Sequence, residues 1–205
     1  MQENPTLAQP RSPLLMNREN TALVVIDVQK KLTPSIQNAP FICWNISRLI
    51  RGCHTLSVPV IASEQYPAGL GETLPFLATL MADAGADVRE KTMFSCREVA
   101  PAFNKLRAKG VQNLVITGLE SHVCVLQSAL DLIGQGFNVF AVVDAVGSRF
   151  QIDHETALCR LELSGATLVS TEMVLFELCE TAAASDFKSI SRLVREELPA
   201  ELETH

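Results

Sequence analysis

The stretch NLVITGLESHVCVLQSALDLIGQG, residues 113–136, places a short apolar strand, a glycine and a helix in direct succession. Residues 114–116 form an apolar run that stops at Gly118, and apolar residues then recur with helical spacing over 122–134. Cys124 lies at the opening of that helix. A free cysteine is commonly a small buried hydrophobe, but at a strand-to-helix turn the backbone N–H groups and the helix dipole favour a thiolate. The rest of the chain has to decide between these two interpretations.

The same pattern, a short β-branched run followed by a helical one, repeats along the chain. Because such runs are typical of strands buried on both faces, the alternation predicts an α/β fold: a three-layer α/β/α sandwich, Rossmann-like, with a roughly six-stranded, mainly parallel sheet. Asp153 and Thr171 stand where helix N-caps belong. The expected strands are 22–27, 59–63, 86–91, 113–118, 138–144 and 166–170, and the expected helices are 40–56, 98–109, 122–134, 153–164 and 171–183.

Length and composition describe an ordinary globular domain and argue against a nucleic-acid-binding or membrane-spanning protein. The 205 residues, 47% hydrophobic and 20% charged, fit one globular domain over 20–205, preceded by an extended, proline-containing arm over 1–19. The net charge of −6 offers no basic face for nucleic acid, and no apolar run reaches the ~18 residues of a membrane span. The first twenty residues lack the layout of a signal peptide, and the six cysteines show no CxxC pair. These features predict reduced thiols in a cytoplasmic protein.

Parallel sheets bind ligands beyond the carboxyl ends of their strands, and chemically capable residues occupy those ends here. Asp27 and Lys91 end two of the expected strands, and Cys124 follows a third. Taken singly, each has a plain explanation: a turn cap, a solvated lysine on an edge strand and a buried thiol. The apolar residues after Lys91 indicate, however, that its side chain points into a cleft. Together, a carboxylate, an ammonium and a thiol are expected at one rim.

Five segments, ALVVIDVQKKLTP, EQYPAGLG, KTMFS, TGLESHVCVLQSALDLIGQGFNV and VVDAVGSR, resemble in order and spacing the isochorismatase-like cysteine hydrolase superfamily. The resemblance covers roughly residues 20–183 and is greatest to the branch of isochorismatase-domain-containing proteins. It implies that Asp27, Lys91 and Cys124 form a catalytic triad. It also implies a cis peptide bond between Leu119 and Glu120, with the N–H groups of Glu120 and Cys124 forming an oxyanion hole.

The resemblance also bears on cofactor and substrate. Nicotinamidases of this superfamily bind zinc through an Asp and two His after the second strand, where this chain reads ASEQYPAGLGE without histidine. We therefore expect no metal and no other cofactor. We expect an amide-type C–N bond of a small metabolite to be cleaved through a thioester on Cys124. The helix start and Lys91 are expected to lower the pKa of the thiol, and Asp27 to accept its proton. The expected pocket residues are Gln29, Tyr66, Phe94, Glu120 and His122.

Two further expectations concern neighbouring residues and assembly. Asp144 and Arg149 are expected to stabilise the neighbouring loop rather than touch substrate, although Arg149 could bind an anion. Because segment 171–183 is very apolar for a last surface helix and relatives assemble, a homo-oligomer, a dimer or larger, is expected.

Other classes of function stay open at this point. A catalytically silent member of the superfamily could serve as a protein-interaction module. A thiol redox sensor would need a second cysteine near Cys124, and Cys96 is the residue that could approach it in space.

Overall fold

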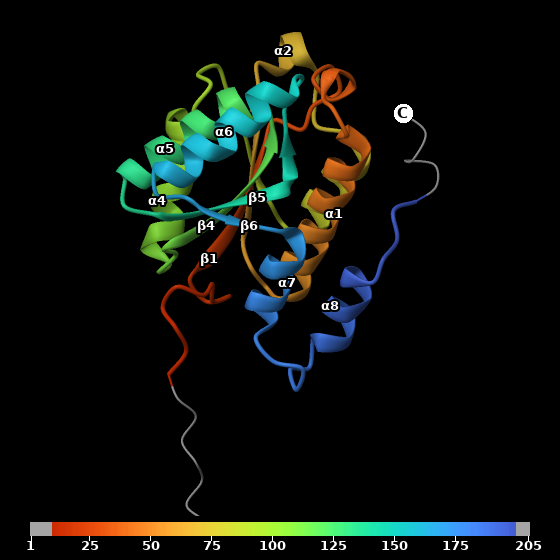
Figure 1. The fold of residues 1–205 in the computed structure, drawn as a ribbon, viewed down its shortest axis with the longest axis vertical. Coiled ribbons are helices and arrows are strands. Elements are labelled where there is room, and N and C mark those ends of the chain that lie inside the picture. Colours follow the sequence, from red (N-terminus) through yellow and green to blue (C-terminus); the bar gives the residue numbers. More distant parts are fainter. Residues whose placement is uncertain (1–9, 200–205) are drawn as a thin grey trace, which may run out of the picture.

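The computed structural model describes residues 10–199, and its centre is a six-stranded sheet in the order β3-β2-β1-β4-β5-β6. Every neighbouring pair of strands in this sheet is parallel. The fold class expected from the sequence is therefore confirmed, as a three-layer α/β/α sandwich (Figure 1). The strands are β1 Thr21–Ile26, β2 Val60–Gln65, β3 Asp87–Lys91, β4 Asn113–Leu119, β5 Asn138–Gly147 and β6 Thr167–Val169.

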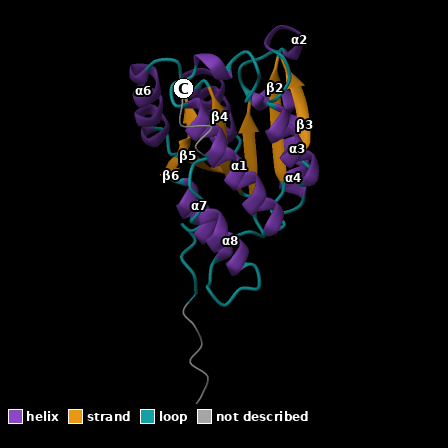
Figure 2. Ribbon diagram, turned by 90° about the vertical axis from the view of Figure 1, so that its right-hand side faces the viewer, coloured by secondary structure: helices purple, strands orange, loops and turns teal. Residues whose placement is uncertain are grey.

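Helices cover both faces of the sheet. On one face lie α1 (Ala39–Thr55), α3 (Pro75–Asp83), α7 (Thr171–Cys179) and α8 (Phe187–Val194). On the other lie α4 (Ala100–Ala108), α5 (Leu126–Gly134) and α6 (Gln151–Leu163). The short α2 (Pro67–Leu70) stands at the end of the sheet toward which β2 and β3 run (Figure 2).

Two apolar cores follow from the alternation of side chains along each buried strand. In β1, Leu23 and Val25 pack in the core beneath α1, whereas Val24 and Ile26 pack in the core beneath α4 and α5. All six residues of β1 are buried, which explains why the sequence shows a continuous apolar run instead of a polar–apolar alternation.

Some element boundaries and three helices differ from the expectations. Helices α2, α3 and α8 are absent from the expected set: α2 has four residues, α3 has only two buried residues, and α8 is a short amphipathic segment. The expected N-caps are wrong by one to three residues: α6 begins after Phe150, and the Ser170 side chain, not that of Thr171, caps α7 by accepting from Met173 N–H. Because α8 packs on α7, the apolar side of α7 is covered within the chain.

Part of the expected amino-terminal arm lies within the described residues and contacts the body. Arg11 donates to the carbonyl of Glu177 at 2.8 Å, Met16 N–H donates to the Glu177 carboxylate at 2.9 Å, and the Met16 side chain is fully buried. The remainder of the arm, residues 1–9, lies outside the described residues. Within the described chain no helix is both long and apolar enough to cross a membrane.

Candidate active site

The carboxyl ends of three strands bring the expected triad together. Asp27 directly follows β1, Lys91 is the last residue of β3, and Cys124 lies five residues beyond the end of β4. Lys91 Nζ lies 2.6 Å from Asp27 Oδ2, and neither side chain has any exposed surface. Both charges act on the Cys124 thiol, which is itself buried. The three side chains that the sequence placed at one rim therefore share one buried site.

Gly118 allows the close approach of strands that this site requires. Its φ is +133°, in the region that favours glycine, and it pairs with Ile26, the residue before Asp27. A Cβ atom added at Gly118 would lie 2.1 Å from the carbonyl oxygen of Ile26. Any larger residue would therefore push β4 away from β1 at the point where Asp27 and the Cys124 turn leave the sheet.

Lys91 is held by three acceptors. Besides Asp27, its ammonium donates to Gln65 Oε1 at 2.7 Å and to the carbonyl of Phe94 at 3.0 Å. An ammonium has three N–H donors, so all of them are used within the protein. Lys91 consequently acts on Asp27 and on the electrostatics of the site, with no donor left for a substrate.

Asp27 is held from a second direction by Ser63. The Ser63 hydroxyl donates to Asp27 Oδ1 at 2.7 Å, and the Cys96 thiol donates to Ser63 Oγ at 3.6 Å. Asp27 itself has a positive φ of 55°, an unfavourable backbone conformation for a residue with a side chain. Donors on both carboxylate oxygens thus fix the orientation of Asp27.

The thiol of Cys124 differs from the expectation. Burial raises its pKa most, the negative charge of Asp27 and a hydrogen bond to that carboxylate raise it further, and Lys91 only partly opposes them. Lys91 does lower this pKa, as expected, but burial and Asp27 outweigh it, so the pKa is raised overall. The ion pair presents its carboxylate to the sulfur as well as its ammonium. At rest Cys124 is a protonated thiol beside a proton acceptor.

The turn between β4 and α5 also differs from the expectation. Residues 10–199 include no cis peptide bond, so the Leu119–Glu120 bond is trans. Glu120 turns the chain by taking a left-handed conformation, φ 58° and ψ 65°, and a turn of π-helix over Ser121–Val125 leads into α5. Cys124 lies within this π-helical turn, and a helix widened in this way often marks a functional position.

A cavity of about 420 Å³ opens beside Cys124. Of the expected pocket residues, Phe94 and Glu120 line it, whereas Gln29, Tyr66 and His122 do not. Tyr66 is exposed at the start of α2. The complete lining is Leu32, Ser35, Gln65, Leu70, Phe94, Glu120, Val123, Cys124 and Arg149.

Gln29 supports the site from behind the cavity wall. Its side chain is fully buried, donates to the carbonyl of Gln65 at 3.0 Å and accepts from Gln65 N–H at 2.8 Å. The Gln65 side chain in turn bridges Lys91 and the carbonyl of Thr92. Gln65 could not be predicted from the sequence, because a glutamine at a strand end has no distinctive pattern.

Polar side chains around Glu120 form one wall of the cavity. Arg149 donates to both carboxylate oxygens of Glu120, from Nε at 3.1 Å and from Nη2 at 3.4 Å. His122 Nε2 lies 3.7 Å from Glu120 and 3.8 Å from Asp153, and its Nδ1 lies 3.0 Å from Ser148 Oγ. Arg149 therefore lines the cavity, which fits the alternative that it binds an anion better than a role in supporting a loop, whereas His122 holds this wall from outside. Asp144 does support structure, accepting from Thr171 N–H at 2.8 Å.

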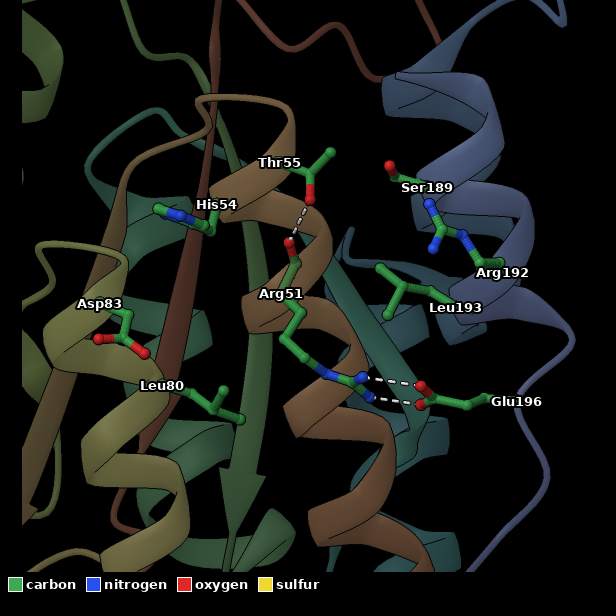
Figure 3. Close-up of a pocket in the computed structure, with 9 residues that line it drawn as sticks. All are labelled: Arg51, His54, Thr55, Leu80, Asp83, Ser189, Arg192, Leu193 and Glu196. Atoms are coloured by element: carbon green, nitrogen blue, oxygen red, sulfur yellow. Dashed lines mark hydrogen bonds and ion pairs between the residues drawn. The ribbon is translucent and has the colours of Figure 1, made fainter.

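A larger cavity, of about 700 Å³, lies elsewhere, between α1, α3 and α8 (Figure 3). Arg51 from α1 crosses it to bind the Glu196 carboxylate, and Asp83 and Arg192 border it. It contains no nucleophile beside a base, so its size does not make it a catalytic site. Within the described residues, no three His, Cys, Asp or Glu side chains are grouped so that they could hold a metal ion.

Comparison with known proteins identifies the family. The model of the isochorismatase domain matches residues 21–173. Isochorismatase domain-containing protein 2A from Mus musculus is 36% identical over 183 residues, covering 88% of this chain and 85% of the mouse protein. A structure described as MAR1 ribonuclease from Caenorhabditis elegans is 37% identical with a TM-score of 0.83, covering 90% of this chain and 94% of the worm chain.

A more distant structure shares the fold. The YcaC gene product from Escherichia coli, described as an octameric hydrolase of unknown specificity, is 23% identical with a TM-score of 0.81, covering 90% of this chain and 91% of that chain. The resemblance that the sequence motifs indicated is confirmed by the family match and by the mouse relative. The chain belongs to the isochorismatase domain family, and this membership supports a role as a hydrolase.

Proposed function

We propose that this protein is a cysteine hydrolase that cleaves an amide-type C–N bond of a small metabolite through a thioester on Cys124. The observation that carries the proposal is the environment of the thiol, which is buried against a cavity and next to a carboxylate fixed by Lys91 and Ser63. A thiol nucleophile beside a carboxylate that can accept its proton is the arrangement that general-base catalysis of acyl transfer needs.

The proposed reaction returns every group to its starting state. As the sulfur of Cys124 bonds to the carbonyl carbon, its proton passes to Asp27; the C–N bond then breaks and the amine leaves with that proton. Asp27 next takes a proton from water while the hydroxide adds to the thioester carbon. The C–S bond breaks, the acid product leaves, and the proton on Asp27 returns to the sulfur.

The backbone at the turn is proposed to stabilise the oxyanion. The N–H groups of Glu120 and Cys124 are the donors implied by the family resemblance, and a trans Leu119–Glu120 bond leaves both groups at the same turn. Preorganised donors of this kind typically contribute a factor of about 10²–10³ to the rate.

A ribonuclease activity, which appears in the description of the worm structure, has less support in this chain. The net charge is −6, and the one arginine that lines the cavity is paired with Glu120. Nucleic acids are bound chiefly through cationic surfaces that neutralise phosphates. We therefore keep a small metabolite as the proposed substrate, with neither a metal nor another cofactor required.

The decisive experiment is hydrolysis of a panel of small amides by wild type and by Cys124→Ala. We expect at least one amide to be hydrolysed, the variant to lose about three orders of magnitude or more in turnover, and mass spectrometry to detect an acyl adduct on Cys124. Retention of activity by Cys124→Ala would exclude the thiol mechanism. If no amide is hydrolysed and no adduct forms, a catalytically silent interaction module becomes the better interpretation.

We also propose that the protein forms a homo-oligomer in the cytoplasm. The support for assembly is that Met173 and Phe176 on α7 stay exposed although α1, β5 and α8 pack against that helix, and that the E. coli protein of the same fold is described as octameric. Light scattering on a size-exclusion column should give a mass above the 22.4 kDa of one chain; a monomer at micromolar concentration would contradict the assembly.

A further inference from the structure

Arg149 has one edge of its guanidinium occupied and the other unoccupied. Its Nε and Nη2 donate to Glu120, and no hydrogen-bond partner of Nη1 occurs within residues 10–199. The side chain is 51% exposed, whereas that of Glu120 is only 9% exposed. Glu120 is thus the buried member of the pair, and it fixes a guanidinium whose Nη1–Nη2 edge has N–H donors to spare.

This guanidinium lines the same 420 Å³ cavity as Cys124. Lys91 uses its three donors within the protein, and the other lining residues include the apolar Leu32, Leu70 and Phe94. Arg149 is therefore the one cation of this cavity with donors available. A guanidinium held in place loses little entropy on binding, and its end-on edge matches the two oxygens of a carboxylate.

We propose that the substrate carries a carboxylate at a distance from its scissile amide, and that Arg149 binds this carboxylate with its Nη1–Nη2 edge while Glu120 holds the guanidinium in position. The inference rests on the proposed hydrolase function. It narrows the substrate class to ω-carboxylated acyl amides, whose carbon chain contacts the apolar part of the cavity.

Alkylation of Cys124 tests the carboxylate site without requiring turnover. The probes are iodoacetate, 3-iodopropionate and 4-iodobutyrate, each compared with its own uncharged amide, so that three lengths sample the span from sulfur to guanidinium. The rate ratio of acid to amide at Cys124, measured by peptide mass spectrometry, is divided by the ratio at the exposed Cys159 of the same molecule. This internal reference removes the intrinsic reactivity of each probe.

In wild type the normalised ratio should exceed one by about tenfold or more for at least one length, as expected for hydrogen bonds to a charged group. Arg149→Gln should abolish this preference. Arg149→Lys should lose most of it, because an ammonium lacks the forked edge. Glu120→Gln should retain the preference, because the amide oxygen of Gln can still accept from Arg149 and hold the guanidinium, while the competing negative charge is removed.

Arg97 provides a matched control. Its side chain is 60% exposed and is paired with the Asp131 carboxylate at 3.9 Å. Arg97 lines a neighbouring cavity that shares Phe94 with the cavity beside Cys124. Arg97→Gln removes the same charge from nearly the same region and should leave the ratio within about twofold of wild type, since exposed charges are largely screened. Equal effects of Arg97→Gln and Arg149→Gln would overturn the proposal, as would a wild-type ratio that never exceeds one.

The amide panel separates this inference from the proposed function. Succinamate and glutaramate should be hydrolysed at least about tenfold faster than their methyl esters, and Arg149→Gln should remove that difference. Hydrolysis that needs Cys124 but shows no preference for the acids would sustain the hydrolase and refute the carboxylate site. An alkylation preference that needs Arg149, without hydrolysis of any amide, would sustain the carboxylate site and refute the hydrolase.

Discussion

At the scale of single residues, the site is a buried thiol beside an ion pair. Burial raises the pKa of Cys124 most, Asp27 raises it further by its charge and its hydrogen bond, and Lys91, fixed by three acceptors, opposes them only in part. The same carboxylate that would take the proton during catalysis therefore suppresses the thiolate at rest. Reactivity toward a substrate and reactivity toward a general alkylating agent are expected to respond in opposite directions when Asp27 is changed.

Asp27→Asn should lower amide turnover by orders of magnitude, because the base is lost, and should speed the alkylation of Cys124 by iodoacetamide. Without the carboxylate charge the pKa of the Cys124 thiol falls, so more thiolate is present at a given pH and alkylation is faster. Alkylation is measured from pH 7 upward by peptide mass spectrometry. Asp83→Asn, a carboxylate in the distant cavity between α1, α3 and α8, serves as the control and should change neither rate. Slower alkylation in Asp27→Asn would contradict the claim that Asp27 raises the pKa of Cys124.

Several site residues could be predicted from the sequence, and others could not, for physical reasons. Asp27, Lys91 and Cys124 follow strand ends, so the topology alone brings them to one rim. Ser63 and Gln65, two positions apart on the same face of β2, support them through their side chains. Nothing in a single sequence marks which strand residues face a buried charge. The role of Arg149 depends on its contact with Glu120, which lies 29 positions away in the chain.

At the scale of secondary-structure elements, the spacing of β1 and β4 sets the site. Both strands are fully buried, and their last residues lead into Asp27 and the Cys124 turn. The long, strongly apolar elements were recognisable from the sequence because their burial pattern is continuous. The π-helical turn at Ser121–Val125 was not, because an ordinary helix and a widened one share the same apolar spacing.

Gly118→Ala should destabilise the protein and impair the site more than a comparable glycine substitution elsewhere. The added Cβ would meet the Ile26 carbonyl at 2.1 Å, in addition to the unfavourable φ of +133°. Gly136→Ala is the matched control: its φ is +87°, but nothing lies within 4 Å of the added Cβ. We expect a loss in the free energy of unfolding of about 1 kcal/mol for Gly136→Ala and clearly more for Gly118→Ala, measured by urea denaturation. Equal losses would mean that strand spacing at Gly118 is not constrained.

At the scale of the whole molecule, buried thiols link stability to pH. Burial raises the pKa of both Cys43 and Cys53 to about 12, and it also raises the pKa of Cys96 and Cys124. In the unfolded chain these thiols ionise near the ordinary value of ~8.5. Above that pH the folded state binds more protons than the unfolded state, so the free energy of unfolding falls as pH rises.

The expected slope is up to about 1.4 kcal/mol per pH unit for each buried thiol above pH ~8.5. Thermal or urea unfolding between pH 7 and pH 10 should show stability declining over the alkaline part of this range. Cys43→Ala/Cys53→Ala should have a shallower decline, whatever its stability at neutral pH. Cys159→Ala, which removes an exposed thiol, should keep the wild-type slope. A double variant with an unchanged slope would rule out these thiols as the source.

The protonated state of Cys124 has a consequence for how long the protein survives in an oxidising cell. Peroxides attack thiolates and not thiols, so a sulfur that ionises only as it meets its proper target is spared the conversion to sulfenic and sulfinic acids. We expect hydrogen peroxide to oxidise the exposed Cys159 before it oxidises Cys124. A thiol that ionises only when substrate is bound therefore also stays unoxidised between turnovers.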